Sequence, residues 1–487
     1  MRLSPVLLAL GVMLAFLGLA MVPCALLDAA LGNQQWSVFG LWGFVVATIG
    51  VVMAVSAGNA RPKTGLREAF MLTVLVWVVL SFAAALPFIS VGYSFTDAMF
   101  ESVSGLTTTG ATVFTDLDTA VEEGTLLWRA ILQWIGGIGI IVTAIAILPF
   151  LQVGGMQLFQ VESSDQTGKF MPRVAEIAAQ TGIVYLVLTI LCASLYAIVG
   201  MSGFDAITHA MTTMAAGGYS THDTSFGWFI ENGAPGAIPV ATVFMFLAGL
   251  PFALLALALL QGRVRPLLTD PQPRLYASII LVLVTLLVIW RMATAGEDAP
   301  GLLATIEMSA FNLISVMTGT GYASAGYDQW GGFAVGIFFL ATFLGGCAGS
   351  AACGIKMFRL EIAVKTLAAY AARMVRPHRV VPVRYGGKPV GETTLQAVMV
   401  FIFLYFATFL VAALLINLAG EDLITAISAS AASVSNVGPG LGGKVGPNGS
   451  FTDLTAFSKW VCLIAMLMGR LEFIAVFVLL MPKFWRG

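Results

Sequence analysis

This sequence of 487 residues has few charged residues: 24 Lys and Arg and 25 Asp and Glu make up 10 % of the chain. A soluble domain normally devotes about a quarter of its residues to charge. This shortage, beside 59 % hydrophobic residues, excludes a soluble globular domain and a disordered chain. A formal net charge of −1 leaves no basic excess for binding nucleic acid. The composition is that of an integral membrane protein.

Cysteine and histidine are also scarce, with five of the first and three of the second. The cysteines lie in apolar surroundings without the spacing of metal ligands, which excludes a disulfide-stapled secreted module and predicts buried free thiols. These cysteines are Cys24, Cys192, Cys347, Cys353 and Cys462. No paired carboxylates and no nucleophile with a neighbouring base stand out, so neither an enzyme nor an organic cofactor is expected.

Long apolar runs take the place of charge. Each is long enough to cross a bilayer as a helix of about 20 residues, in which every backbone amide is satisfied. The ten runs lie near residues 3–27, 38–57, 69–91, 128–150, 178–202, 237–260, 275–294, 333–357, 394–419 and 457–481. The first run is longer than the apolar stretch of a signal peptide, so we expect it to remain as a membrane anchor.

The basic residues fall mainly on one side of these spans. Nineteen of the 24 Lys and Arg lie in one set of loops and ends, together with seven acids, whereas 17 acids and four basic residues lie in the other set. Because basic loops stay in the cytoplasm, both termini are predicted to be cytoplasmic. The acidic outer face would attract cations to the membrane surface, which suggests a cation as substrate.

A fourfold internal repeat is the most informative pattern. Every second outer loop holds a short amphiphilic segment, too short to span, that ends in a glycine-containing polar stretch. The segments cover residues 95–114, 204–223, 305–326 and 422–443. An acid precedes the glycine by 13, 13, 14 and 16 residues, and the four glycines are 108, 103 and 117 residues apart. We infer one unit copied four times: helix, half-helix, glycine loop, helix.

Asp97, Asp205 and Asp422 are placed to cap or complement the positive N-terminal end of a half-helix. Glu307 has the corresponding place in the third unit. The negative C-terminal ends then point inward. Irregular backbone at membrane depth is tolerated only where it is buried in protein or lines a wet cavity, so four such loops imply a central pore.

Glycine allows dihedral angles at which successive carbonyl oxygens can replace the water shell of a cation. No carboxylate lies within the short stretches, which favours a monovalent ion. The predicted potassium ligands are the backbone of Thr108, Thr109, Gly110, Ala216, Gly217, Gly218, Gly319, Thr320, Gly321, Asn436, Val437 and Gly438. The alternative is a purely structural role, in which each Thr-Gly or Gly-Gly pair is only a turn between helices.

The four loops TTTGAT, AAGGYST, TGTGYAS and NVGPGLG, in this order, resemble the filter sequences of the TrkH family of bacterial potassium uptake proteins, within the Trk, Ktr and HKT superfamily. The resemblance covers nearly the whole chain. It implies an all-α polytopic membrane protein with two leading helices and four pseudo-symmetric repeats of helix, pore helix, filter loop and helix around a central pore. Glycine in all four loops resembles the potassium-selecting members, because sodium-preferring relatives place Ser in the first loop.

Two further segments carry the resemblance. The run at 344–359 is interrupted by small residues, which in the family form an intramembrane loop that obstructs the pore, although close helix packing is the alternative reading. Here Ala351, Ala352 and Cys353 replace the more usual Thr and Gly. Arg470, in the last apolar run, resembles the family's pore arginine; the alternatives are a structural salt bridge or a snorkelling side chain. The implied gating residues are Gly345, Gly346, Gly349, Ser350, Gly354, Lys356 and Arg470.

The predicted domains are two leading helices (1–60) and four pore repeats (61–155, 156–265, 266–385 with the intramembrane loop, and 386–487). By resemblance we expect potassium as the transported substrate, a bacterial inner-membrane location, a homodimer and a cytosolic nucleotide-binding regulatory ring like TrkA. The alternatives are an ion-coupled secondary active transporter, a less selective sodium and potassium pore, and a non-transporting sensor. His209 and His222 flank the second loop, where surface or capping roles are expected.

Overall fold

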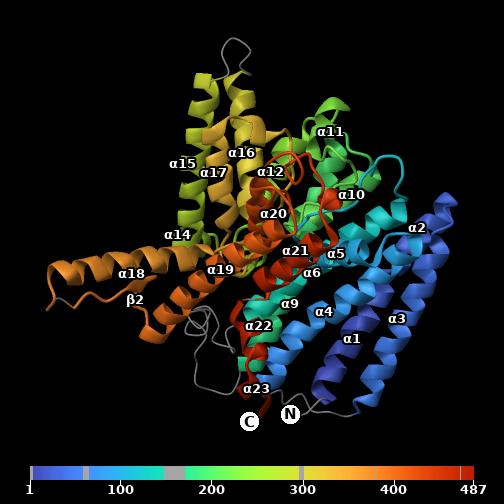
Figure 1. The fold of residues 1–487 in the computed structure, drawn as a ribbon, viewed down its shortest axis with the longest axis horizontal. Coiled ribbons are helices and arrows are strands. Elements are labelled where there is room, and N and C mark those ends of the chain that lie inside the picture. The colour runs from blue at the N-terminus through green and yellow to red at the C-terminus, as the bar shows by residue number, and fades with distance from the viewer. Residues whose placement is uncertain are drawn as a thin grey trace.

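The structure, a computed structural model, describes residues 4–58, 65–146, 170–294, 301–378, 380–471 and 473–486. Helices account for almost all regular structure in these residues (Figure 1). The one strand pair that they form is an antiparallel hairpin of β1 (Arg384–Tyr385) and β2 (Lys388–Pro389). The predicted all-α membrane fold is confirmed.

Two leading apolar spans, the first made of two consecutive helices, precede four repeats of the same plan. The leading helices are α1 (Ser4–Ala20), α2 (Val22–Leu31) and α3 (Trp36–Ser56). The first repeat holds α4 (Leu66–Val91), the pore helix α5 (Phe95–Leu106) and α6 (Glu123–Ala146). The second holds α9 (Phe170–Ile198), the pore helix α10 (Gly203–Met214), α11 (Phe226–Glu231), α12 (Ala237–Ala248), α13 (Phe252–Gln261) and α14 (Arg265–Thr269).

The third repeat holds α15 (Pro271–Thr294), the pore helix α16 (Leu302–Thr318), η2 (Tyr327–Gln329), α17 (Gly332–Phe343) and α18 (Met357–Val375). The fourth holds α19 (Glu392–Leu418), the pore helix α20 (Leu423–Ser435), η3 (Phe451–Asp453), α21 (Ala456–Arg470), α22 (Phe473–Leu480) and α23 (Pro482–Arg486). Helix α18 and the hairpin project from the body of the molecule (Figure 1).

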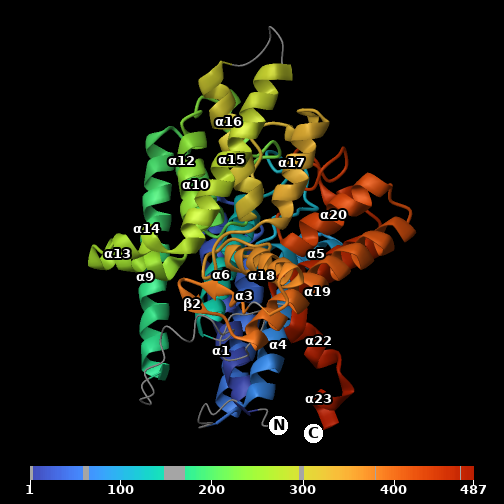
Figure 2. The same ribbon diagram turned by 90° about the vertical axis from the view of Figure 1, so that its left-hand side faces the viewer.

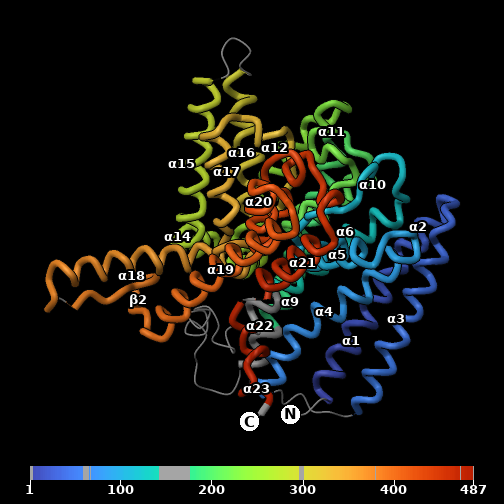
Figure 3. Tube along the Cα trace, in the orientation of Figure 1, coloured from blue at the N-terminus to red at the C-terminus, as the bar shows by residue number. Residues whose placement is uncertain are grey.

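The repeats close into a ring. Within each repeat the first helix packs on its own pore helix: α4 on α5, α9 on α10, α15 on α16 and α19 on α20. The helix after each pore helix packs on the next pore helix: α6 on α10, α12 on α16, α17 on α20 and α21 on α5. The last of these contacts brings the red end of the chain against its cyan segment (Figure 3). The predicted fourfold arrangement therefore exists as a closed cycle of helix contacts.

Small residues allow the leading helices to pack closely. A methyl group on Gly11 or Gly18 of α1 would lie 2.6 Å from the carbonyl oxygen of Gly50 or Gly43 of α3, respectively. Without a hydrophobic driving force between helices in lipid, such close backbone approach is a main source of helix association. The pair α1 and α3 packs in turn on α4, beside the ring.

The N-termini of the pore helices are capped by side chains, though not always by the predicted acid. Ser94 is the N-cap of α5, and its hydroxyl accepts from the backbone N–H of Asp97 (3.1 Å) and donates to the Asp97 carboxylate (2.7 Å). Ser202 and Asp205 repeat this arrangement in α10. These acids are therefore third-position partners of a serine cap. Asp422 is itself the N-cap of α20, as predicted.

Glu307 has no capping role, because α16 begins five residues before it, at Leu302. The third pore helix is longer than the other three, so the acid of this repeat falls within the second turn of the helix. The looser spacing of acid and glycine in this repeat reflects that difference.

Two of the apolar runs predicted as continuous spans are broken. The run 237–260 bends by 107° between α12 and α13, at Gly249–Pro251, and the run 457–481 bends by 109° between α21 and α22. Pro251 explains the first bend, since proline cannot continue the hydrogen bonding of a helix. Within the described ranges, seven helices are long and apolar enough to span a membrane, or up to nine with each bent pair counted as one span.

The described part of α1 begins, and α23 ends, on the same side of the molecule (Figures 1 and 2). The cytoplasmic location of both termini remains a prediction. Some of the basic residues on which the predicted orientation depends lie outside the described residues, namely Arg2, Arg61, Lys63, Lys169 and Arg379. Residues 147–150, which end the apolar run 128–150, and Glu472 lie outside them as well.

Gly136 of α6 provides a test of the packing of the first repeat. A methyl group there would overlap the carbonyl oxygen of Leu106 at the end of α5. We expect Gly136→Ala to destabilise the protein by about 1–3 kcal/mol through overpacking, measured as a lower midpoint of thermal unfolding in detergent. Gly139→Ala in the same helix is the control, because no atom lies within 4 Å of a methyl group there. Equal midpoints for the two variants would contradict this packing.

Candidate functional site

Each pore helix ends in the same backbone turn. In the first repeat the N–H of Thr108 bonds to the carbonyl of Gly105 (3.0 Å) and that of Thr109 bonds to Ser104 (2.8 Å), which is a Schellman motif. The second and fourth repeats have the same pair of bonds. In the third, the N–H of Gly319 bonds to Val316 and the outer bond comes from Gly321 instead. The turns direct all four chains out of the helix at the same level.

Two left-handed residues follow in every repeat. The first has φ of 51°, 51°, 79° and 53° at Thr108, Ala216, Gly319 and Asn436. The second, two residues later, has φ of 83°, 77°, 81° and 91° at Gly110, Gly218, Gly321 and Gly438. A β-branched residue such as Thr108 in this region costs about 1–3 kcal/mol and persists only where its surroundings enforce it. Such strain is typical of functional sites.

The four glycine loops, residues 108–110, 216–218, 319–321 and 436–438, pack against one another in a cycle. A methyl group on Gly110 would overlap the carbonyl oxygen of Gly217, and one on Gly218 would overlap that of Thr320. The cycle continues from Gly321 to the carbonyl of Val437. It closes because a methyl group on Gly438 would lie 2.6 Å from the carbonyl oxygen of Thr109.

This cycle is the geometry that the prediction requires. The carbonyl oxygen of the residue before each glycine points toward the glycine of the preceding repeat. A side chain on that preceding glycine would overlap this oxygen. All twelve predicted loop residues therefore lie together around one axis, and none is at the periphery. No carboxylate belongs to the four loops.

The four glycines also line a single cavity of about 290 Å³ on one side of the ring. Its wall includes Arg129 and three side chains of the loops that follow the first and second pore helices, namely Asp116, His222 and Asp223. The cavity is a vestibule that opens on the glycine loops.

A buried ion pair supports the first two loops from behind. Glu101 of α5 and Arg129 of α6 lie 2.7 Å apart and are almost completely buried. The Glu101 carboxylate also accepts from the hydroxyl of Thr112 and the N–H of Val113, while Arg129 donates to the carbonyl of Ser220 (3.0 Å). Because a buried charge without its partner is strongly destabilising, this pair fixes the first loop to the second.

Gln133 of α6 holds the second loop by both ends of its amide. Its nitrogen donates to the carbonyl of Gly217 (2.7 Å), and its oxygen accepts from the N–H of Tyr219 (3.0 Å). The Gly217 carbonyl thus already has one donor, so its second lone pair is the one available to an ion.

One tyrosine ties the second loop to the preceding pore helix, and another does the same for the third loop. Tyr219 follows the second glycine and donates to the carbonyl of Glu101 in α5 (2.9 Å). Tyr322 follows the third glycine and donates to the carbonyl of His209 in α10 (3.1 Å). In the fourth loop, Asn436 donates to the hydroxyl of Thr109 (2.8 Å) and to the carbonyl of Met466 (3.0 Å). The ring is therefore braced from repeat to repeat.

The interrupted run of the third repeat forms an intramembrane loop, residues 344–356, between α17 and α18. Leu344 and Ile355 form a parallel bridge at its neck. The loop satisfies the backbone freed by the bend of α12 and α13: Cys347 N–H donates to Gly249 (2.9 Å), and Phe252 N–H donates to Gly349 (3.0 Å). The two breaks therefore satisfy each other's backbone groups, as irregular backbone within a membrane requires.

Cys353 brings this loop beneath the ring. Its N–H donates to the carbonyl of Thr318 (3.2 Å) at the start of the third glycine loop, and its sulfur lies 3.9 Å from the Thr108 hydroxyl in the first. The first and third loops are opposite each other in the cycle. A side chain that touches both must lie close to the axis.

Arg470 reaches the same place from α21. Its guanidinium donates to the sulfur of Cys353 (2.6 Å) and to the hydroxyl of Thr108 (2.6 Å), and only 5 % of the residue is exposed. It thus links the intramembrane loop to the first glycine loop. Among the residues that the structure describes, neither of these side-chain partners is a carboxylate.

The other predicted gating residues all lie in or beside the intramembrane loop. Gly345, Gly346 and Gly349 make backbone hydrogen bonds with Ile355, Met357 and Phe252. Gly354 has φ of 70°, the Ser350 hydroxyl donates to Cys347 (2.6 Å), and the Lys356 ammonium donates to the carbonyl of Ala352. The loop is a hydrogen-bonded structure and not a seam of packed helices.

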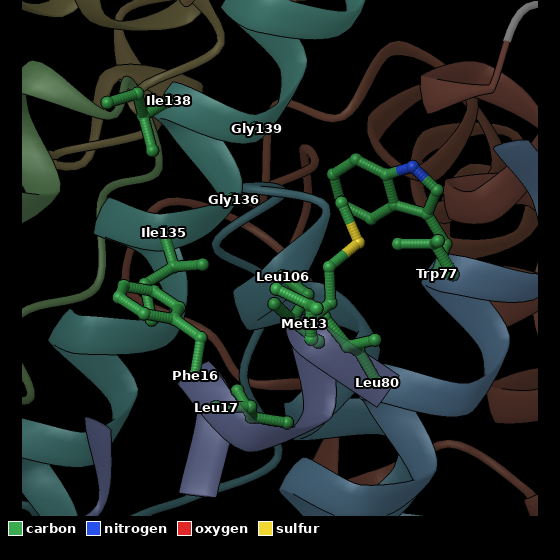
Figure 4. A pocket seen from close by; sticks show the side chains of 12 residues that line it. Met13, Phe16, Leu17, Trp77, Leu80, Leu106, Ile135, Gly136, Ile138 and Gly139 are labelled. Atoms are coloured by element: carbon green, nitrogen blue, oxygen red, sulfur yellow. The ribbon is translucent and has the colours of Figure 1, made fainter. Parts of the chain in front are cut away.

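An apolar cavity of about 310 Å³ lies behind the first pore helix, between α1, α4 and α6. Figure 4 shows Met13, Phe16 and Trp77 around it, with Leu106 and Gly136 at its base. Its wall is apolar throughout, so it offers no ligand to an ion.

Comparison with known proteins agrees with this geometry. Residues 38–486 match the TrkH family, described as a cation transport protein. The chain is 42 % identical to the Trk system potassium uptake protein TrkI of Halomonas elongata over 86 % of this chain and 84 % of that protein. It is 37 % identical to Trk system potassium uptake protein TrkH of Escherichia coli over 91 % of both chains. The chain belongs to the TrkH family.

The fold also matches a solved TrkH-family structure. The crystal structure of the potassium transporter TrkH from Vibrio parahaemolyticus superposes with a TM-score of 0.90, at 33 % identity, over 100 % of both chains. The family is one of membrane transporters and not of enzymes, as the composition predicted.

The side chains that brace the TrkH-family ring were not predicted from the sequence. Glu101, Arg129 and Gln133 were available as polar residues in otherwise apolar helices, and an intramembrane polar side chain is itself a signal. The first left-handed residue of each loop gave no signal, because three of the four (Thr108, Ala216 and Asn436) are not glycine.

The two histidines beside the second loop differ from their expected surface or capping roles. His209 of α10 is fully buried, with its ring nitrogens 2.9 Å from the carbonyl of Asp205 and 3.0 Å from the hydroxyl of Ser220. His222 stacks on Trp228 and pairs with Asp118 and, at 3.4 Å, with Asp205. Burial alone would lower the pKa of His222, but hydrogen bonds to the two carboxylates outweigh it and raise the pKa above its ordinary value.

This shift predicts a pH dependence of stability. A raised native pKa means that the ion pairs of His222 stabilise the fold fully below the unfolded pKa of about 6.5, and lose this contribution as the pH rises through the native pKa. We expect His222→Gln to lower stability by about 1 kcal/mol at pH 5.5 and by less at pH 8.5, measured by thermal unfolding. His378→Gln, at an exposed site, is the control. A larger loss at pH 8.5 than at pH 5.5 would contradict the assignment.

Proposed function

We propose that this TrkH-family protein conducts potassium ions across the membrane along the axis of the four glycine loops. The observation that supports this most is the closed cycle in which each glycine faces the carbonyl oxygen of the next loop. Such a ring can replace the water shell of a cation by backbone oxygens, which is the requirement for passage of a dehydrated monovalent ion. The curated relatives, which are named potassium uptake proteins, support potassium as that ion.

The electrostatic environment of the ring favours binding of a cation, but with an affinity low enough for the ion to leave again. Each pore helix ends at its glycine loop, so its partially negative carbonyl end lies next to the axis. The absence of a carboxylate from the loops keeps the site suited to one positive charge. Potassium would therefore move down its electrochemical gradient, with the acidic side chains of the vestibule attracting it to the entrance.

Gating is assigned to the intramembrane loop and Arg470. The guanidinium holds Cys353 and Thr108 at the same time, so it closes the space beneath the ring and puts a positive charge where the ion would leave. Release of Cys353 from Arg470 would let the loop withdraw. The predicted loop glycines then supply the conformational freedom for that movement.

We further propose that the protein lies in the inner membrane with both termini in the cytoplasm. We also propose that it forms a homodimer and binds a cytosolic regulatory ring like TrkA. These proposals are supported by the family resemblance, by the bias of basic residues and by the projecting helix α18, which exposes Leu367, Tyr370 and Met374. Measuring the mass of the detergent-solubilised protein tests the dimer.

Gly110→Ser tests the ion pathway. The serine side chain would overlap the carbonyl of Gly217 and displace it from the ring, so we expect potassium selectivity over sodium to fall about tenfold, a change of about 1.4 kcal/mol. The measurement is rubidium uptake into liposomes at a clamped voltage, with potassium or sodium as competitor.

Gly92→Ser is the matched control, because Gly92 is also left-handed (φ 116°) but has no neighbour within 4 Å of an added methyl group. Selectivity unchanged in Gly110→Ser would refute the pathway. Accumulation of rubidium without a driving voltage would instead favour a secondary active transporter.

Arg470→Ala tests the gate. Removal of the charge and of both hydrogen bonds should raise the rubidium flux about tenfold, which corresponds to a barrier lower by about 1.4 kcal/mol. Cys353→Ala removes only the link to the intramembrane loop and should raise flux less. A protein that folds normally but conducts more slowly after Arg470→Ala would show that the arginine does not obstruct the path.

A further inference from the structure

Three carboxylates meet where the leading helices join the first repeat. Asp28 lies in the last turn of α2, and Glu122 and Glu123 lie at the start of α6. One carboxylate oxygen of each lies within 4.8 Å of the other two. The side chain of Asn33 donates to Asp28 (3.2 Å) and to Glu123 (2.8 Å), which holds two of the acids in place.

Asp28 is fully buried, and half of its carboxylate has no partner. Its Oδ1 accepts from the N–H of Gly124 (2.8 Å) and from Asn33. Its Oδ2 is buried and has no hydrogen-bond donor among the residues that the structure describes. A buried carboxylate oxygen beside two further carboxylates is unfavourable unless a proton or a cation joins it.

No positively charged side chain fills this need within the described chain. The ion pairs found there involve other acids, namely Glu101, Asp118, Asp205, Glu361, Glu421 and Asp97. The N-terminal end of α6 attracts anions, and this explains the bond from Gly124 to Oδ1. It does not satisfy Oδ2, which has no N–H within reach.

We propose that Asp28, Glu122 and Glu123 bind one calcium ion. Three carboxylate oxygens within 4.8 Å of one another can contact one calcium ion at about 2.3–2.6 Å after small adjustments of the side chains, whereas magnesium needs oxygens at about 2.0–2.1 Å in a strict octahedron. Calcium also accepts irregular sets of carboxylates completed by water. The ion would lie among the three carboxylates and offset the cost of burying the Asp28 charge.

The site would connect the leading helices to the glycine loops. Helix α6 begins at the three carboxylates and carries Arg129 and Gln133, which hold the first and second loops. Calcium therefore fixes the start of the helix that braces half of the ring. It has no place on the ion path itself, so binding is measured apart from transport.

The test uses the purified full-length protein in detergent with 100 mM potassium chloride. Calcium binding is followed by titration calorimetry, and stability by thermal unfolding with and without calcium. We expect one calcium ion per chain with a Kd of about 10⁻⁴–10⁻³ M, the range of extracellular calcium modules, and a higher unfolding midpoint with calcium. Magnesium should bind at least about tenfold more weakly.

Glu122→Gln should weaken calcium binding at least about tenfold and remove the stabilisation, and Asp28→Asn should do the same. Glu231→Gln, which changes an exposed acid at the end of α11, is the matched control and should bind as the unchanged protein does. If Asp28→Asn does not fold, Glu122→Gln and Glu123→Gln decide.

Three outcomes would overturn the proposal. These are the absence of saturable calcium binding, equal binding by Glu122→Gln, and equal affinity for magnesium. Stabilisation by acid but not by calcium would show instead that Asp28 holds a proton.

Discussion

The fold depends on one constraint: backbone that leaves the helical pattern inside a membrane must find its hydrogen bonds within the protein. Four glycine loops and one intramembrane loop break that pattern here, and their backbone groups find partners within the protein. The turns after the pore helices satisfy their own helix ends, and the intramembrane loop pairs with the bend at Gly249. The irregular segments are therefore stable only as an assembled ring.

The same constraint produces the site. Once the loops must be buried together, glycine is the residue that lets a carbonyl oxygen from the neighbouring repeat come close, and four such contacts close the cycle. The left-handed conformations of Thr108, Ala216 and Asn436 are strained for residues with a side chain. Braces such as the Glu101 and Arg129 pair, Gln133 and the two tyrosines hold that strain in place.

Much of this could be predicted from the sequence because it follows from local pattern. The apolar runs, the fourfold spacing and the glycine at each loop are visible in the chain, and the twelve loop residues are brought together as expected. The bend at Pro251 was also visible, but the apolar run around it was interpreted as one helix. Proline in a run of that length is a signal for a break.

The rest depends on contacts between distant segments. No spacing indicates that Arg470 bonds to Cys353 and Thr108, since the three residues come from different repeats. The role of Glu101 is likewise fixed only when α6 places Arg129 against it. Ser94 and Ser202 took the capping positions expected of Asp97 and Asp205, because a serine three residues earlier completes the capping box.

The central claim is that an ion is held by backbone oxygens on the axis of the ring. The most direct measurement is anomalous diffraction from crystals in which potassium is replaced by thallium or rubidium. The account predicts a peak on the axis between the carbonyl oxygens of Thr109, Gly217, Thr320 and Val437, above Cys353. Peaks confined to the periphery of the molecule, with none among the four glycine loops, would contradict it.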